Sequence, residues 1–312
     1  MTLRTPNPYR SYQTHLNLQR SKERLAILQD QIGSDKRITR LSDDPTAAAL
    51  IMDFQSSIAR NKMYIKQGET AKSFLKGTEA AINSAIIQMD RLLELGQQGL
   101  SEVLGPRGRE AIAAEVDVVR TVILDLSNTQ EQGKYIFAGT ATRTLPFAFT
   151  AGPHIWNDPL GNPNAVDYDG NLGAIDVNIS PNSSITTNLT GSYVFQGNGG
   201  ADEDIFIAVT MLRDGLQADD TDMIRQAYEN LRAIKDRFNV CLTQVGSRQV
   251  QLDNSGMNLG DMNEMLQSIQ NTYEAPDYPW VIHQFAAEQT AQEYAYAVLS
   301  RMGRNSLFDY LG

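Results

Sequence analysis

The chain has 312 residues, 41% hydrophobic and 21% charged, a composition typical of a folded protein rather than a disordered one. The net charge of −10 argues against a protein that wraps nucleic acid or binds an anionic membrane. The single cysteine, Cys241, excludes an intrachain disulfide. Residues 1–20 lack the apolar core of a signal peptide, and no apolar run could cross a bilayer, so we expect neither a cleaved signal nor a membrane span.

Residues 9–32 have the apolar spacing of an amphipathic helix, and Gly33-Ser34-Asp35 ends the pattern. The sequence SDDP, residues 42–45, then predicts the start of a second helix. Asp44 can accept a hydrogen bond from an amide of the first turn. Pro45 suits the first helical position because the amide proton that it lacks would have no partner there. One apolar stripe of the first helix consists of Leu18, Leu25, Leu28 and Ile32.

The helix after Pro45 carries two apolar stripes, so we expect it to contact partners on two sides. Gly105-Pro106 ends this stretch, and a further helix follows over residues 112–126. Residues 134–203 are rich in Gly, Pro, Asn and Asp and contain short β-prone pieces. We therefore predict a β-rich insert, with strands at residues 135–137, 174–177 and 193–195.

Helices resume at residues 205–216, and from Ile224 to Tyr273 the apolar positions step strictly by three and four. This spacing indicates a coiled-coil helix of roughly 50 residues. Only Arg248 and Ser255 interrupt the apolar seam with polar side chains. Prolines 276 and 279 end the helix. A last amphipathic helix then carries one stripe of Ile282, Phe285, Tyr296 and Leu299.

No catalytic or metal-binding constellation is recognisable in the sequence. The three histidines, His15, His154 and His283, are too scattered to form a zinc site, and no phosphate-binding loop or nucleophile elbow occurs. Cys241 falls on the coiled-coil seam, which favours a small buried hydrophobe over a nucleophile. The pair Asp43-Asp44 is better explained as a helix cap. We predict a protein that is not an enzyme and has no catalytic, cofactor-binding or metal-binding residues.

Five stretches of the sequence carry a family resemblance. The segment GSDKRITRLSDDPTAAALIMDFQSSI resembles the signature of the bacterial flagellin family, with the motif Ser42-Asp43-Asp44-Pro45 before an Ala-rich helix. KYIFAGTATRTLPF, VDYDGNLGAIDVNISPNSSITTNLTGSYVF, TQVGSRQVQL and the ending SLFDYL are similar to the hook-associated members of that family. The resemblance covers nearly the whole chain.

The resemblance implies a flagellin-like fold that is mainly α with a β-rich insert. Long coiled-coil-type helices from the N- and C-terminal segments would form a bundle, with a small β domain in the middle. The expected domains are a terminal helical domain of residues 1–44 and 280–312, a helical rod domain of 45–133 and 204–279, and an outer β-rich domain of 134–203.

The resemblance also implies a function: a structural adaptor ring at the hook–filament junction, on which flagellin polymerises. Its implied partners are flagellin, hook-associated protein 1, about eleven copies of the chain itself in a ring and a flagellar export chaperone. No nucleic acid, membrane, cofactor or small-molecule substrate is implied. The protein would reach the flagellum outside the cell by type III export without a cleaved signal peptide.

We expect the terminal helices to carry this function by pairing with each other and then with neighbouring copies. Each apolar side chain newly buried would contribute about 2 kcal/mol before the entropy of ordering is subtracted. Three alternatives stay open. They are a filament flagellin, a helical translocator or tip protein of another type III secretion system, and an enzyme or lectin activity in residues 134–203. The expected interface residues are Leu18, Leu25, Leu28, Ile32, Ile282, Phe285, Tyr296 and Leu299.

Overall fold

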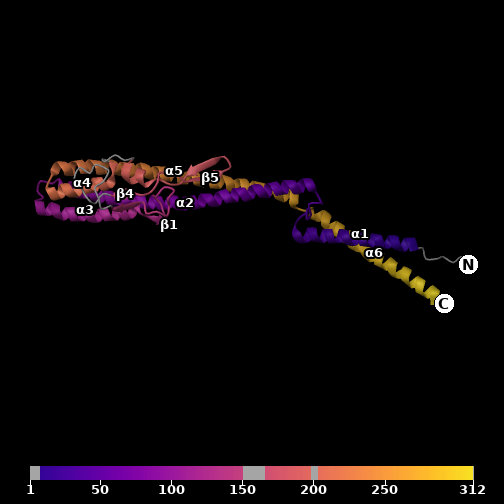
Figure 1. Cartoon of the computed structure of the whole chain (residues 1–312). Coiled ribbons are helices and arrows are strands. Elements are labelled where there is room, and N and C mark those ends of the chain that lie inside the picture. The colour runs from indigo at the N-terminus through magenta and orange to yellow at the C-terminus, as the bar shows by residue number, and fades with distance from the viewer. Residues whose placement is uncertain (1–7, 150–165, 198–202, 312) are drawn as a thin grey trace. The chain divides into compact units, whose positions relative to one another are not determined.

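The computed structural model describes residues 8–149, 166–197 and 203–311, with side chains between residues 12 and 300 (Figure 1). His154 lies outside the described residues. By backbone contacts the chain divides into two compact units, residues 1–60 with 261–312 and residues 61–260. In the part of the chain that the structure describes, no helix combines the length and apolar character needed to cross a membrane.

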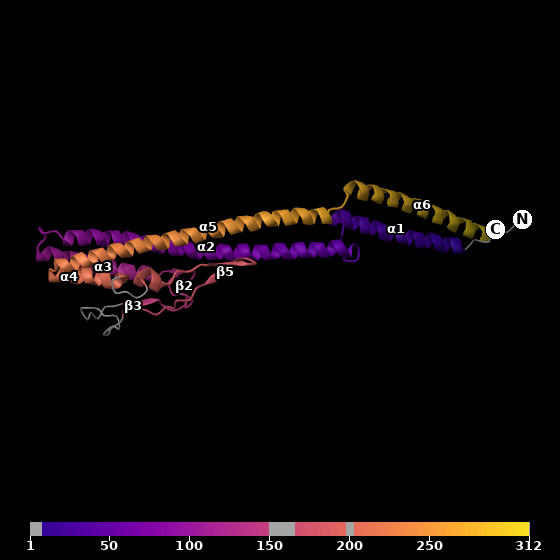
Figure 2. The ribbon, with the colours of Figure 1, turned by 90° about the horizontal axis from the view of Figure 1, so that it is seen from above.

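The first unit contains the helices of the two chain ends. Helix α1 (Pro8–Ser34) packs against α6 (Tyr278–Leu311), and the two helices run side by side in Figures 1 and 2. The unit also holds the first part of α2 (Pro45–Gly99) and the last part of α5 (Thr221–Glu274). The helix starts and breaks agree with the sequence: α2 begins at Pro45, and a break separates α5 from α6.

The second unit is built on the remaining lengths of α2 and α5, together with α3 (Pro106–Ser127) and α4 (Ile205–Ala218). The α5 seam is buried from Ile224 to Val245, with each apolar member fully covered. Both apolar stripes predicted for α2 are also covered here, because Leu75 and Ile82 of one stripe and Ala85 and Leu92 of the other are buried. The coiled-coil spacing therefore corresponds to a real helix–helix core.

The β structure consists of three separate antiparallel strand pairs. They are β1 (Gln130–Glu131) with β2 (Lys134–Tyr135), β3 (Phe147–Phe149) with β4 (Val166–Tyr168), and β5 (Asp176–Ser180) with β6 (Ser183–Thr186). An aromatic cluster joins this region to the helices: the Phe147 ring centre lies 5.5 Å from that of Phe195 and 5.5 Å from that of Phe206 on α4. The mainly helical fold with small strand pairs is confirmed, whereas the domain boundaries stay a prediction.

The structure differs from the sequence prediction in the positions of the strands within the insert. Residues 193–195 are not a strand but part of a short π-helical turn, η1 (Ser192–Gln196). The guanidinium of Arg237 on α5 donates to the carbonyl oxygens of Val194 and Phe195, so a distant helix holds the turn in place. The predicted strands at 135–137 and 174–177 are shifted to 134–135 and 176–180.

The two polar interruptions of the α5 seam have a structural explanation. The Arg248 guanidinium donates to the carbonyl oxygen of Asn188 at 2.9 Å, and the Ser255 hydroxyl donates to the carbonyl oxygen of Ile179 at 3.0 Å. Both acceptors belong to buried residues of the β5–β6 region. Arg248 and Ser255 therefore anchor the β hairpin on the helices.

Candidate helix-pairing site

The SDDP motif forms a braced turn before α2. The Asp44 carboxylate accepts a hydrogen bond from the Ala47 amide at 3.0 Å, as expected for a helix cap. This bond is the main reason that the pKa of Asp44 lies below its usual value. The Asp43 carboxylate accepts from the amides of Arg40 at 2.9 Å and Thr39 at 3.2 Å. The two aspartates therefore have different tasks, since Asp44 caps the helix and Asp43 shapes the turn.

The break between α1 and α2 is joined to the break between α5 and α6. The Arg37 amide donates to the carbonyl oxygen of Glu274 at 2.6 Å, and its guanidinium donates to the carbonyl oxygen of Tyr273 at 3.3 Å. The Tyr278 hydroxyl donates to the Asp35 carboxylate, which raises the pKa of Tyr278. Asp35 has a left-handed backbone with φ of 56°, a conformation that favours glycine.

The α1–α6 contact combines apolar packing with one polar cluster. Leu18 and Leu28 of α1 are buried, as is Val281 at the start of α6. The Glu288 carboxylate accepts from the Ser21 hydroxyl at 2.7 Å and from the Arg24 guanidinium at 2.6 and 3.1 Å. The bonds from Arg24 and then Ser21 lower the pKa of Glu288. A two-point contact of this kind fixes the orientation of the pair as well as adding attraction.

The predicted interface residues lie in this region, but not all of them are covered. Leu25, Phe285 and Leu299 are half-buried, whereas Ile32, Tyr296 and Ile282 are 37%, 47% and 57% exposed. Val281 is not among the predicted residues, although it stands four residues before Phe285 and so shares its helix face. The cluster of Ser21, Arg24 and Glu288 was not predicted either, because apolar spacing gives no signal for polar contacts on the pairing face.

The described residues offer little support for metal binding or for nucleophilic catalysis. His15 and His283 are exposed and on different helices, and no group of three or more His, Cys, Asp or Glu side chains is placed to hold a metal ion within the described ranges. Cys241 is buried, and burial raises the pKa of its thiol to about 11. The thiolate needed for nucleophilic chemistry is therefore scarce at neutral pH.

Comparison with known proteins finds similarity to the family that the motifs resemble. Residues 7–142 match the bacterial flagellin N-terminal helical region. The chain is 24% identical over 298 residues to flagellar hook-associated protein 3 of Escherichia coli (strain K12), covering 89% of this chain and 90% of that protein. The chain is similar to flagellar hook-associated protein 3. The protein of that name from Salmonella typhimurium (strain LT2) is also 24% identical, over 90% of this chain and 91% of its own.

Solved structures of such proteins share the fold. The flagellar hook-associated protein 3 of Legionella pneumophila matches with a TM-score of 0.62 and 14% identity, over 71% of this chain and 98% of that one. FlgL of Bacillus cereus matches with a TM-score of 0.56 and 21% identity, over 70% of this chain and 99% of that one. The resemblance expected from the motifs is thus confirmed, and the structural likeness concerns the fold alone.

Proposed function

We propose that the chain is a non-enzymatic structural protein of the bacterial flagellum that forms an adaptor ring at the hook–filament junction, on which flagellin polymerises. The similarity to flagellar hook-associated protein 3 over nine-tenths of the chain supports this assignment. Hook-associated protein 1 on one side and flagellin on the other are the proposed partners, with about eleven copies in the ring. An export chaperone would deliver the chain to type III export, without a cleaved signal peptide.

One observation carries the proposal: α6 keeps large apolar side chains exposed after it has paired with α1. Tyr294 is 70% exposed, and Trp280, Ile282, Tyr296 and Val298 are also exposed. A single soluble chain gains nothing from presenting such a surface to water, whereas a surface of this kind is typical of one that is covered on assembly. The terminal helices would therefore pair first with each other and then with neighbouring copies.

The exposed apolar side chains of α6 would add favourable free energy only when another copy covers them. Each large apolar side chain buried on assembly contributes about 2 kcal/mol, from which the entropy of association must be subtracted. Contacts of this size are weak for one pair of copies. They add up when each copy touches two neighbours in a closed ring.

The first experiment is complementation of a strain from which the gene has been deleted. We expect the deleted strain to shed unpolymerised flagellin into the medium, and the intact gene to restore filaments. Labelled protein should give a single spot at the tip of the hook. Label along the whole filament would instead identify a filament flagellin, and normal filaments in the deleted strain would refute the adaptor assignment.

A pair of matched variants tests whether the α6 surface is the working part. Ile282→Asp with Tyr294→Asp places charges at two exposed positions of α6, so we expect full secretion but loss of filaments. Val240→Asp changes an apolar side chain of α5 that is 51% exposed, and it should complement normally. Filaments of normal length with the α6 variant would contradict the proposed role of this surface.

A further inference from the structure

Strand β5 has one edge without a partner strand. Among the described residues, β5 pairs with β6 alone, as an antiparallel hairpin. The Thr187 amide donates to the carbonyl oxygen of Ile175 at 2.9 Å, so these two residues form a hydrogen-bonded pair. Bonded and non-bonded pairs alternate along an antiparallel ladder. Asp176 and Asn178, one and three positions after Ile175, therefore belong to non-bonded pairs.

The backbone groups of Asp176 and Asn178 face away from β6. In a non-bonded pair, the N–H and C=O groups of each residue point to the outer edge of its own strand. No described residue outside the hairpin forms a backbone hydrogen bond with either residue. The register shifts between Asn178 and Ser180, which ends the regular edge. The free edge therefore offers one donor and one acceptor from each of these two residues.

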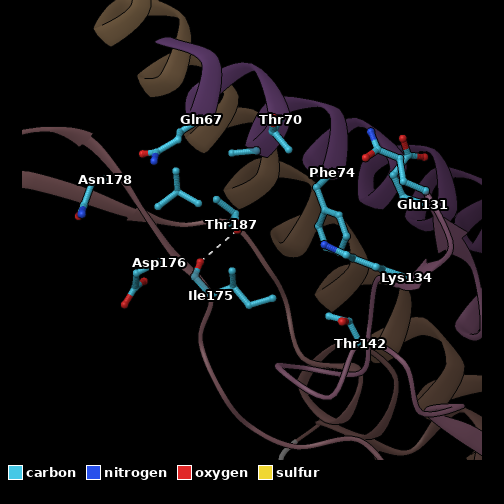
Figure 3. Close-up of a pocket in the computed structure, with 13 residues that line it drawn as sticks. Gln67, Thr70, Phe74, Glu131, Lys134, Thr142, Ile175, Asp176, Asn178 and Thr187 are labelled. Carbon is cyan, nitrogen blue, oxygen red and sulfur yellow. Dashed lines mark hydrogen bonds between the residues drawn. The ribbon is translucent and has the colours of Figure 1, made fainter. Parts of the chain in front are cut away.

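A cavity of about 450 Å³ lies along this edge (Figure 3). Its lining includes the consecutive residues 175–178. Successive side chains of a strand point to opposite faces, so a cavity on one face would touch every second residue. A lining of consecutive residues places the cavity along the edge of the strand, beside the unpaired backbone groups. Its volume is within the range of pockets that hold ligands.

Helix α2 forms another wall of the cavity. The lining residues Gln67, Thr70, Ala71 and Phe74 have the spacing of one helix face. Figure 3 shows Thr70 on the side of α2 and Asp176 on the side of the strand. A segment that lay between them could place an apolar side chain against Ala71 and Phe74 while its backbone faced β5.

The charged side chains of the lining have both signs. Glu131 and Asp176 supply carboxylates, and Lys134 supplies an ammonium group. The Glu131 carboxylate accepts a hydrogen bond from the Ser73 hydroxyl at 3.0 Å, and the Asp176 carboxylate accepts one from the Thr186 hydroxyl at 2.6 Å. Charge therefore does not select a ligand of one sign, and the unpaired backbone groups of β5 decide what fits.

We propose that β5 binds an extended segment of a partner polypeptide, which adds a strand to the hairpin along this cavity. An extended backbone presents donors and acceptors at the same repeat as the free edge, so it pairs with both Asp176 and Asn178. The α2 wall favours an apolar side chain on the face of the segment that turns towards it. The site lies in the second unit and does not depend on the pairing of the terminal helices.

A proline substitution tests the edge itself. Asn178→Pro removes an amide that faces away from β6, so the hairpin keeps its own hydrogen bonds while an added strand loses a donor and meets the proline ring. Ser184→Pro is the matched control. Ser184 is the partner of Asn178 in the ladder, and its amide faces the opposite edge of the hairpin. We expect similar urea unfolding curves for the two variants.

The probe is a phage-displayed library of random heptapeptides, selected on the full-length chain. We expect enriched peptides in which apolar and polar residues alternate. Synthetic copies should bind at least tenfold more weakly to Asn178→Pro than to the unsubstituted chain, whereas Ser184→Pro should bind like the unsubstituted chain. Fluorescence anisotropy of the labelled peptides measures these affinities.

Methylation of the peptide amides gives a second measure that needs no change in the protein. The amides of a bound strand alternate between facing β5 and facing away from it. N-methylation at every second position should therefore weaken binding at least tenfold, and N-methylation at the positions between should have little effect. This series decides the question by itself if Asn178→Pro proves less stable than Ser184→Pro.

Three results would overturn the inference. The first is a selection that enriches no peptide on the unsubstituted chain relative to Asn178→Pro. The second is equal binding by two equally stable variants, Asn178→Pro and Ser184→Pro. The third is an N-methylation series without a period of two, which would show a ligand held by its side chains alone. Each of these results leaves the adaptor proposal standing, because that proposal is tested by complementation and by the α6 variants.

Discussion

At the scale of single residues, Asp204 is a buried acid of the second unit. It caps α4 by accepting from the amides of Phe206 at 2.7 Å and Ile207 at 3.3 Å. Burial nevertheless dominates, and it raises the pKa of Asp204 to about 6. The folded chain therefore holds a proton on this carboxyl at pH values where the unfolded chain has lost it.

This difference predicts a pH dependence of stability. Because the pKa is higher in the folded chain, the contribution of Asp204 to stability is complete below pH 4 and is lost as the pH rises through 6. The loss amounts to about 3 kcal/mol at most. Asp204→Asn should remove it, so that urea unfolding of the variant changes less between pH 4 and pH 7 than that of the unsubstituted chain.

A matched control for this prediction is Asp220→Asn. The Asp220 carboxylate caps α5 by accepting from the amides of Asp222 and Met223, but it is exposed. Asp220→Asn tests the effect of the same chemical change at a cap in contact with water. Parallel stability curves for Asp204→Asn and the unsubstituted chain between pH 4 and pH 7 would show that burial of Asp204 has no such consequence.

The loop between β1 and β2 offers a second prediction at this scale. Its two residues, Gln132 and Gly133, both have left-handed backbones, with φ of 52° and 74°. Two-residue hairpin loops of this type favour Asn at the first position. Gln132→Asn should therefore raise the free energy of unfolding by about 0.5 kcal/mol, measured by urea titration. Gln130→Asn within β1 should give no gain, and an equal gain from both variants would contradict the explanation.

At the scale of elements, the α5 seam shows why regular spacing is not always optimal. The heptad spacing by itself would favour an apolar residue in place of Arg248. The structure shows that its guanidinium donates to the carbonyl oxygen of the buried residue Asn188. Arg248 is therefore the position at which the otherwise apolar seam of α5 binds the β-hairpin region.

We predict that Arg248→Leu destabilises the second unit even though it completes the apolar seam. Loss of the donor leaves a buried carbonyl without its partner, which costs roughly 1–3 kcal/mol. Hydrogen exchange should speed up over residues 175–188, and urea unfolding should shift to lower concentration. Val250→Leu, at an exposed position of the same helix, is the control. Unchanged or greater stability of Arg248→Leu would show that the seam, and not the hairpin anchor, governs this region.

At the scale of the whole molecule, the two units differ in how much they bury. The second unit has a continuous core that includes large side chains with no exposure, such as Phe195, Phe238 and Leu92. The α1–α6 pair depends on a few covered side chains, mainly Leu18, Leu28 and Val281, and on the Arg24–Glu288 ion pair. Regions with few buried apolar contacts open at lower free energy than a packed core.

Limited proteolysis should show this difference. In the isolated chain we expect cleavage within α1 and α6 well before cleavage within the described parts of residues 61–260. Assembly with other copies should protect both helices, because their exposed apolar faces become covered. Equal resistance of α1, α6 and the second unit in the isolated chain would argue against ordering that is coupled to assembly.

The sequence by itself determined the helices, their starts and their breaks. Pro45, Asp44 and Pro276 act on neighbouring backbone, and the spacing of apolar residues reports the helix face directly, so local chemistry was sufficient. The same stretches supplied the family resemblance. In the terminal pair, Leu18 and Leu28 are buried whereas Ile32 and Ile282 are 37% and 57% exposed, and the apolar spacing does not encode this difference.

Only the tertiary structure decided the strands, the turn at residues 192–196 and the polar anchors. Strands of two to five residues have almost no intrinsic signal, and they form where a partner distant in sequence supplies hydrogen bonds and apolar cover. The roles of Arg248, Ser255 and Arg237 depend on carbonyl groups that come from separate segments of the chain. Such pairings arise from how the helices pack, and no local pattern of residues encodes them.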